Sequence, residues 1–300
     1  MIYILGIVVI LFLLLNHTIV FHRKLRLNVF TEKYSHTKDL WFKKDGNTKL
    51  IIFLHGMFST PSTFEDLAEI LLLKGWDVYI PTLPASAISR EDLQSIGSWA
   101  WKESLIIIRE KINSLPNNYQ KVVLGGHSQG GSLAMNIATE RSFDGLIVVS
   151  SPVNLYGNHL KLWQNVAIYL SGLLSFVFPN GVLESIPYQQ ERAKVEKLCD
   201  AEGIQYPYTI YTFKQGLKIL RQNLYKIQMP LFLAYCKGDI LVNFKNLELI
   251  KNSVSSKKII EKTYDISFEE EPYGFRHQLL NYSKTKNNLN VSIVSFLDNL

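Results

Sequence analysis

The chain has 300 residues, of which 47% are hydrophobic and 12% aromatic, and its formal net charge is +6. This length and apolar content suffice for a full core and exclude a chain that is disordered throughout. The 32 Lys and Arg residues include no arginine-rich arm, and the sequence has no zinc-type Cys/His spacing, so we expect no nucleic-acid partner.

The N-terminal segment has the length and polarity of a membrane anchor. From Ile2 to Phe21 nearly every residue is apolar, and a basic cluster follows at 22–26. A helix over this segment would be about 30 Å long, enough to cross the hydrocarbon core of a bilayer. Because the charges follow the apolar run, the positive-inside rule predicts a single-pass anchor with the following domain in the cytoplasm.

Two other interpretations of this segment stay open, a cleavable signal peptide and a buried N-terminal helix. A signal peptide normally carries basic residues before its apolar run and a small-residue cleavage site after it, and neither is present here. The predicted organisation is therefore a transmembrane anchor with its basic flank at 1–27, followed by one folded domain at 28–300.

After a polar stretch at 28–48, short apolar runs alternate with segments of helical periodicity. Strands are predicted at Lys49–Leu54, Trp76–Ile80, Lys121–Leu124, Gly145–Ser150, Pro230–Cys236 and Lys258–Tyr264. Helices are predicted at Pro61–Lys74, Ser98–Leu115, Gln129–Glu140, Phe244–Val254 and Ser283–Leu300. This alternation indicates an α/β fold with parallel strand–helix–strand units, and the apolar strands indicate a sheet covered by helices on both faces.

The alternation stops at about 153–228, where a helical and hydrophobic insert is predicted. Its most apolar part runs from Leu162 to Phe178 and is short for a membrane span. One interpretation is a helix packed on the core that lines an apolar pocket. The other is an interfacial segment that dips into a membrane. Interruptions at Gly172 and Ser175 favour the first.

The cysteine content argues against a disulfide framework and against a metal site. The chain has two cysteines, Cys199 and Cys236, each in or beside a segment that is predicted to be buried. We therefore expect two free thiols in a reducing compartment, with no metal ion and no organic cofactor.

The sequence Gly126-His127-Ser128-Gln129-Gly130 falls between a predicted strand and a predicted helix. In a Gly-x-Ser-x-Gly pattern the serine sits on a sharp strand-to-helix turn, and the flanking glycines allow neighbouring backbone to approach. A serine hydroxyl is a poor nucleophile, so it needs a base and donors for the oxyanion. The alternative is a tight turn in which Ser128 only caps the helix.

Four short motifs occur in an order that resembles the bacterial carboxylesterase and monoacylglycerol lipase branch of the α/β-hydrolase superfamily. They are Leu54-His55-Gly56-Met57-Phe58, Gly126 to Gly130, Cys236-Lys237-Gly238-Asp239 and Arg276-His277-Gln278-Leu279-Leu280. The resemblance spans about Lys49 to Leu300, with weak support inside the insert. It departs from the family at Pro81-Thr82-Leu83-Pro84-Ala85, where Gly-His-Gly is frequent, and at Arg276, where glycine is common.

The resemblance implies an α/β-hydrolase fold, with a mostly parallel sheet flanked by helices and the insert as a cap over the active site. It also implies a catalytic triad in the chain order that this fold uses. Ser128 would attack an acyl carbonyl, His277 would take and return its proton, and Asp239 would orient the imidazole. The backbone N–H groups of Met57 and Gln129 would hold the oxyanion.

Each assignment has a plainer alternative. His277 could be a surface histidine and Asp239 a helix cap, and Asp265, at the end of the last strand, is the alternative acid. His55, before the oxyanion loop, is expected to be structural, and His127 to be packed in the turn.

The resulting hypothesis is a serine hydrolase that cleaves carboxylic esters through an acyl-enzyme intermediate. The predicted anchor and apolar cap favour lipid-like esters of the monoacylglycerol or lysophospholipid type. One alternative is a thioesterase or acyltransferase with the same triad. Another is a non-catalytic protein of this fold that binds a ligand or partner.

Overall fold

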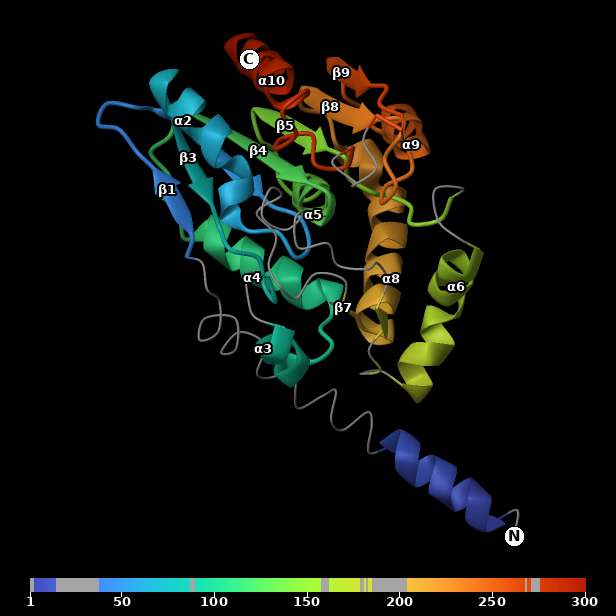
Figure 1. Cartoon of the computed structure of the whole chain (residues 1–300). Helices are drawn as coiled ribbons and strands as arrows, with labels where there is room; N and C mark the ends of the chain where they lie inside the picture. Colours follow the sequence, from blue (N-terminus) through green and yellow to red (C-terminus); the bar gives the residue numbers. More distant parts are fainter. Residues whose placement is uncertain are drawn as a thin grey trace.

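A seven-stranded sheet in the order β1-β3-β2-β4-β5-β8-β9 organises the molecule (Figure 1). The computed structural model describes residues 3–14, 38–86, 90–157, 162–178, 181, 183–184, 204–267, 269–270 and 276–300. Along the sheet every neighbouring pair is parallel except β1 with β3. The predicted α/β class with a mostly parallel sheet is confirmed.

All six predicted strands form, with small changes at their ends. They are β2 (Lys49–Leu54), β3 (Trp76–Ile80), β4 (Lys121–His127), β5 (Gly145–Val149), β8 (Leu231–Cys236) and β9 (Ile259–Tyr264). Strand β4 runs further than predicted, because Gly125, Gly126 and His127 pair with β5. Glycine by itself disfavours a strand. Here Gly125 and Gly126 are paired with β2 on one side and with β5 on the other.

Strand β1 (Leu40–Phe42) was not predicted, since it lies in the polar stretch before the first apolar run. It pairs antiparallel with β3, and Trp41 faces Tyr79 with ring centroids 4.5 Å apart. A three-residue edge strand carries almost no pattern of its own. Its formation depends on the open edge of β3, which belongs to tertiary structure.

All five predicted helices form. They are η1 (Pro61–Phe64) with α2 (Glu65–Leu73), α4 (Trp101–Asn113), α5 (Gln129–Ala138), α9 (Lys245–Ser253) and α10 (Lys286–Asp298). The short helix α3 (Arg90–Ile96) was missed. Helix α4 begins later than predicted because the Glu103 carboxylate accepts the Ala100 N–H at 2.7 Å and caps the first turn there.

Alternate residues of β2 enter two different cores, which shows how helices cover both sheet faces. Leu50, Ile52 and Leu54 pack with residues of α4, α5 and α8. Ile51 and Phe53 pack with residues of α2 and α10 on the other face. This is the period-two pattern of a strand buried on both sides, and it holds the carboxyl ends of the strands in a rigid layer.

The segment between β5 and β8 contains the predicted insert. It comprises α6 (Leu162–Val177), the antiparallel pair β6 (Leu183–Glu184) and β7 (Ile204–Gln205), α8 (Pro207–Asn223) and η2 (Leu224–Lys226). Helix α8 packs on the core, where a side chain at Gly216 would collide with Trp101.

Helix α6 packs along α8 (Figure 1), and many of its large apolar side chains are exposed. Its buried residues are small, Ser171 and Ser175, whereas Trp163 and Leu173 are 52% and 61% exposed. Lys214 of α8 donates to the backbone oxygen of Ile168 at 2.9 Å and joins the two helices. Many large apolar side chains of α6 therefore lie at the surface, whereas its buried side chains are small.

The predicted single-pass membrane anchor at Ile2–Phe21 is wrong. Within the described part of the chain, no helix combines the length and the apolar character that a membrane span requires. The described N-terminal helix covers residues 3–14, which is about 18 Å at 1.5 Å per residue, against a hydrocarbon core of about 30 Å. The cytoplasmic placement of the folded domain rested on this anchor and is overturned with it. The basic cluster at 22–26 lies outside the described residues.

Candidate active site

The carboxyl ends of β2 and β4 lie side by side at the point where the sheet changes its winding direction. The chain passes from β2 to β3 on one side and then returns to β4 on the other, with Leu54 paired to Gly126. In open α/β sheets such a switch point leaves a crevice beyond the carboxyl ends of the strands. The His55–Phe58 loop and the Ser128 turn both start there.

Ser128 stands on a strained turn between β4 and α5. Its backbone has φ 54° and ψ −125°, a conformation that a non-glycine residue rarely adopts. A Cβ at Gly126 would lie 2.4 Å from the Gly130 carbonyl carbon, and a Cβ at Gly130 would lie 2.0 Å from the Leu54 oxygen. The two glycines of the motif are thus required by close backbone approach, and the turn packs directly on the end of β2.

Backbone strain gathers at this edge of the sheet. Among the described residues four non-glycines have positive φ: Phe58, Ala85, Ser128 and Ser150. Each follows the carboxyl end of a different strand, β2, β3, β4 or β5. Such strain persists only where surrounding structure enforces it, and it is frequent at functional sites.

His277 and Asp239 form a buried pair. The imidazole Nδ1 lies 2.8 Å from Asp239 Oδ2, and both side chains are almost fully buried. The other carboxylate oxygen accepts the backbone N–H groups of Leu241 and Val242 at 2.8 and 2.9 Å. Because the carboxylate holds the proton on Nδ1, the Nε2 lone pair of His277 is available to act as a base.

Asp265, the alternative acid, lies elsewhere. Its side chain is 73% exposed and pairs with Lys237 at 2.8 Å. The structure therefore brings Asp239 to His277 and leaves Asp265 on the surface. Asp239 also does more than cap a helix, since one of its oxygens contacts the imidazole.

The loop of His277 contacts the Ser128 turn through His127, the residue directly before the serine. The rings of His127 and His277 are 4.8 Å apart, and His127 Nε2 lies 3.0 Å from the backbone oxygen of His277. Within the described residues the Ser128 hydroxyl makes no hydrogen bond. Bonds between a nucleophile and its base are often long without substrate.

The loop predicted to hold the oxyanion packs on Ser128. A Cβ at Gly56 would lie 3.3 Å from the Ser128 Cβ. Met57 follows, half-buried, and its sulfur accepts a bond from the Gln205 side chain of β7 at 3.5 Å. Gln129 is the first residue of α5. The backbone N–H groups in the first turn of a helix have no carbonyl partner within that helix, and the N–H of Gln129 is one of them.

His55 is locked in one neutral tautomer, which agrees with the structural role predicted for it. Its Nδ1–H donates to the Gly56 oxygen at 2.9 Å, and its Nε2 accepts the Leu83 N–H at 3.0 Å. Burial lowers the pKa of His55 to about 4. The ring therefore ties the β2 loop to the β3 loop without carrying a charge.

Asp39 also holds the loop that follows β3. Its carboxylate accepts the Thr82 N–H at 2.9 Å, the Tyr79 hydroxyl at 2.5 Å and the Lys111 ammonium at 2.6 Å. Burial opposes its ionisation, but these bonds outweigh it and lower the pKa of Asp39. Sequence inspection did not single out this cluster, because its members come from three segments that are far apart in the chain, at 39, 79–82 and 111.

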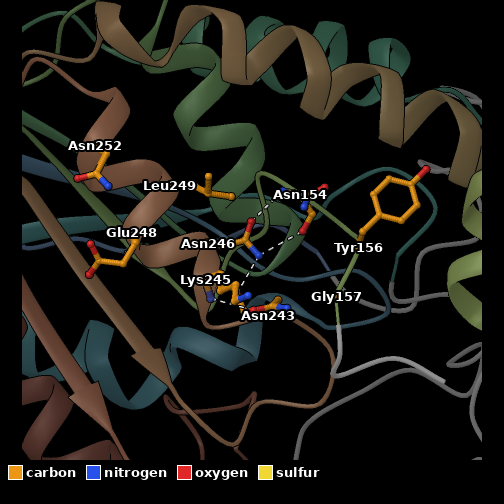
Figure 2. Close-up of a pocket in the computed structure, with 9 residues that line it drawn as sticks. All are labelled: Asn154, Tyr156, Gly157, Asn243, Lys245, Asn246, Glu248, Leu249 and Asn252. Carbon is orange, nitrogen blue, oxygen red and sulfur yellow. Dashed lines mark hydrogen bonds between the residues drawn. The ribbon is translucent and has the colours of Figure 1, made fainter. Parts of the chain in front are cut away.

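A pocket of about 460 Å³ lies between α9 and the segment that contains Asn154, Tyr156 and Gly157 (Figure 2). Its walls are one side of α9 with the preceding Asn243, and the segment after β5, and the buried Asn246 joins them. The Asn246 side chain accepts the Asn154 N–H at 2.7 Å and donates to the Asn243 oxygen at 2.8 Å. Ser128 and His277 are not among the residues that line this pocket, so it is separate from the Ser128 turn.

Cys236 is a buried free thiol at the end of β8, and burial raises its pKa. Cys199 lies outside the described residues. Among the described residues no group of three or more His, Cys, Asp or Glu side chains is arranged to hold a metal ion.

Comparison with known proteins identifies a family for most of the chain. The family model described as serine aminopeptidase, S33, matches residues 45–281. This range contains the Ser128 turn, Asp239 and His277. In contrast, no curated protein sequence matches the chain.

Solved structures with the same fold include two lipases. A monoacylglycerol lipase from Paleococcus ferrophilus superposes with a TM-score of 0.68 at 15% identity, covering 86% of this chain and 97% of that one. A soluble variant of monoglyceride lipase from Saccharomyces cerevisiae, solved with a substrate analogue, has a TM-score of 0.68 at 16% identity, covering 89% and 94%. MenH from S. aureus has a TM-score of 0.58 at 16% identity, covering 88% and 98%. At such identities the likeness shows the fold alone.

Proposed function

Because the chain belongs to the serine aminopeptidase S33 family of α/β-hydrolases, we propose that it cleaves carboxylic esters through an acyl-enzyme intermediate on Ser128. The observation that carries this proposal is the buried bond between His277 Nδ1 and Asp239, held against the turn that exposes Ser128. Nucleophile, base and acid from three loops at one sheet edge are what acyl transfer requires.

In this mechanism His277 Nε2 takes the hydroxyl proton while the Ser128 oxygen attacks the acyl carbonyl. Asp239 stabilises the imidazolium that forms. The tetrahedral intermediate collapses when His277 returns the proton to the leaving alcohol, which leaves an ester on Ser128. Water, deprotonated by the same imidazole, then attacks that ester and releases the carboxylic acid and free enzyme.

The negative charge on the substrate oxygen needs fixed donors. In this proposal the donors are two backbone N–H groups, that of Gln129 at the start of α5 and that of Met57 in the loop against Ser128. The helix N-terminus adds a favourable electrostatic field. Backbone donors of this kind stabilise the transition state without needing to reorganise during the reaction.

We propose further that the acyl substrates are lipid-like, of the monoacylglycerol or lysophospholipid type. The support is the insert between β5 and β8: residues 162–178 carry no charged side chain, and α6 presents large apolar groups such as Leu162 and Phe176 at its surface. Two solved structures of the same fold are described as monoacylglycerol and monoglyceride lipases, which agrees with this choice.

The direct test of catalysis is labelling by a fluorophosphonate probe. The intact chain should be labelled, and Ser128→Ala should not be. Ser132→Ala is the matched control, because Ser132 is also buried in this region but donates to the Pro152 oxygen, so its variant should keep the label. A folded chain that takes no label would overturn the proposal.

The substrate class needs a separate measurement. We expect kcat/KM for p-nitrophenyl esters in detergent to rise from acetate toward long acyl chains by at least about tenfold, since each buried methylene favours binding. Turnover of acetate with no turnover of long chains would leave the esterase proposal standing and refute the lipid part.

A further inference from the structure

His127 is buried at the end of β4, directly before the proposed nucleophile. Its backbone is fixed in the sheet by pairing with Val149, so the ring is carried on a rigid element. From there the ring extends to the loop of His277. Its Nε2 lies 3.0 Å from the His277 backbone oxygen, and because a carbonyl can only accept, the Nε2–H donates.

The same ring contacts the oxyanion loop on its other side. A Cβ at Gly56 would lie 3.2 Å from His127 Nδ1. His127 thus lies between the loop that follows β2 and the loop that carries His277, and it adjoins Ser128 in the chain. One side chain meets all three pieces of the proposed site.

Packing alone does not explain an imidazole at this position. With Nε2 as the donor, Nδ1 carries a lone pair, and among the described residues this buried atom has no hydrogen-bond partner. A phenyl ring would fill similar space without that cost. The feature that an imidazole adds is the bond to the His277 carbonyl.

The ring also stays neutral beside a base that becomes charged. Burial lowers the pKa of His127 to about 3, and the neighbouring His277 adds to this effect. When His277 takes the Ser128 proton, the cation therefore forms beside a neutral ring rather than a second cation. The bond to the carbonyl persists through both protonation states of His277.

We propose that His127 is a positioning residue, which holds the backbone of His277 against the Ser128 turn and so sets the direction of the His277 imidazole. It acts through His277 and does not touch the substrate. This inference rests on the proposed function, since it assigns a task within the same site.

The test compares two amides of different reach. The amide nitrogen of Gln can occupy approximately the place of a histidine Nε2, and that of Asn the place of Nδ1. His127→Gln should therefore restore the bond and keep kcat on a p-nitrophenyl ester within about fivefold of the unaltered chain. His127→Asn and His127→Phe should lower kcat about 10- to 100-fold with KM changed less than about twofold, because a misdirected base slows chemistry and not binding.

A second readout does not depend on turnover. In nitrogen-15 NMR of the histidine rings, the intact chain and His127→Gln should show His277 with its proton fixed on Nδ1. His127→Phe should show an averaged signal for that ring. Thermal unfolding of each variant shows whether it is folded.

The outcomes separate this inference from the function on which it rests. An intact chain that neither turns over esters nor takes the fluorophosphonate label refutes the proposed function. An active intact chain with a Phe variant of equal kcat refutes the positioning role. If the Phe and Asn variants fail to fold, the test depends on His127→Gln alone. A kcat within fivefold of that of the intact chain supports the positioning role, and a Gln variant that is folded but inactive overturns it.

Discussion

The backbone N–H of Leu83 donates to His55 Nε2 at 3.0 Å and joins the loops that follow β3 and β2. The Leu83 loop is the segment that departs from the frequent Gly-His-Gly pattern, and Asp39 holds it at Thr82. A non-standard loop is thereby anchored to the histidine beside the proposed oxyanion donors. This connection makes His55 a testable support of the loop that contains Met57.

Replacing His55 should loosen that loop. In His55→Phe both ring bonds are lost, to Gly56 and to Leu83. We expect kcat on a short ester to fall about 100-fold, the usual effect of a misplaced oxyanion donor. His55→Asn can keep the Gly56 bond and should lose less. Equal kcat in His55→Phe and the intact chain would show that the loop holds its shape unaided.

Two buried neutral histidines should make the fold sensitive to acid. The pKa of His55 is lowered to about 4 and that of His127 to about 3, in both cases chiefly by burial. Above about pH 6.5 both rings are neutral in the folded and unfolded chains, so their contribution is fully present there. As pH falls below 6.5, the two rings become protonated in the unfolded chain but stay neutral in the folded chain. The free energy of unfolding therefore falls by about 1.4 kcal/mol per pH unit for each ring.

Urea unfolding at pH 7, 6 and 5 measures this effect. His127→Gln removes one of the two rings, so its stability should fall less steeply between pH 6.5 and 4 than that of the intact chain. The difference between the two slopes isolates His127 from carboxylates that titrate in the same range. Parallel slopes would contradict the assignment of His127 as a neutral buried group.

The choice of acid can be tested with a matched pair of variants. Asp239→Asn should lower kcat about 10⁴-fold, since an amide can donate to Nδ1 and stabilise the wrong imidazole tautomer. Asp265→Asn should change kcat less than about threefold, because this exposed side chain pairs with Lys237 and not with His277. A large loss in the Asp265 variant would contradict the site as described.

Two glycine variants test the close packing of the Ser128 turn. In Gly130→Ala the new Cβ would lie 2.0 Å from the Leu54 oxygen, which no side-chain movement relieves. We expect a loss of more than about 4 kcal/mol in unfolding free energy, or no folded protein. In Gly172→Ala of α6 the new Cβ meets only the Tyr211 ring at 3.2 Å, and stability should change by less than about 1 kcal/mol. Similar thermal midpoints for both variants would refute this packing.

Sequence patterns predicted the elements that carry strong local signals and missed those that depend on neighbours. Strands β2 and β3 match their predicted bounds because their mostly apolar runs, interrupted in β3 by Asp77, end at His55 and Pro81. Strand β1 was missed because its partner edge, not its composition, makes it a strand. The membrane anchor was the clear error: an apolar run of sufficient length was predicted to form one long helix, whereas the described helix covers residues 3–14.

For the site, sequence patterns were enough to identify which groups are available and in what order: a serine between glycines at a strand end, then aspartates, then a histidine. Which aspartate contacts His277 depends on where the loops after β8 and β9 turn, and this is seen only in the folded chain. The bond from His127 to the His277 backbone oxygen, between residues 150 positions apart, is likewise visible only there. Periodicity and turn signals act over a few residues, whereas hydrogen bonds between loops of different strands exist only after the sheet has assembled.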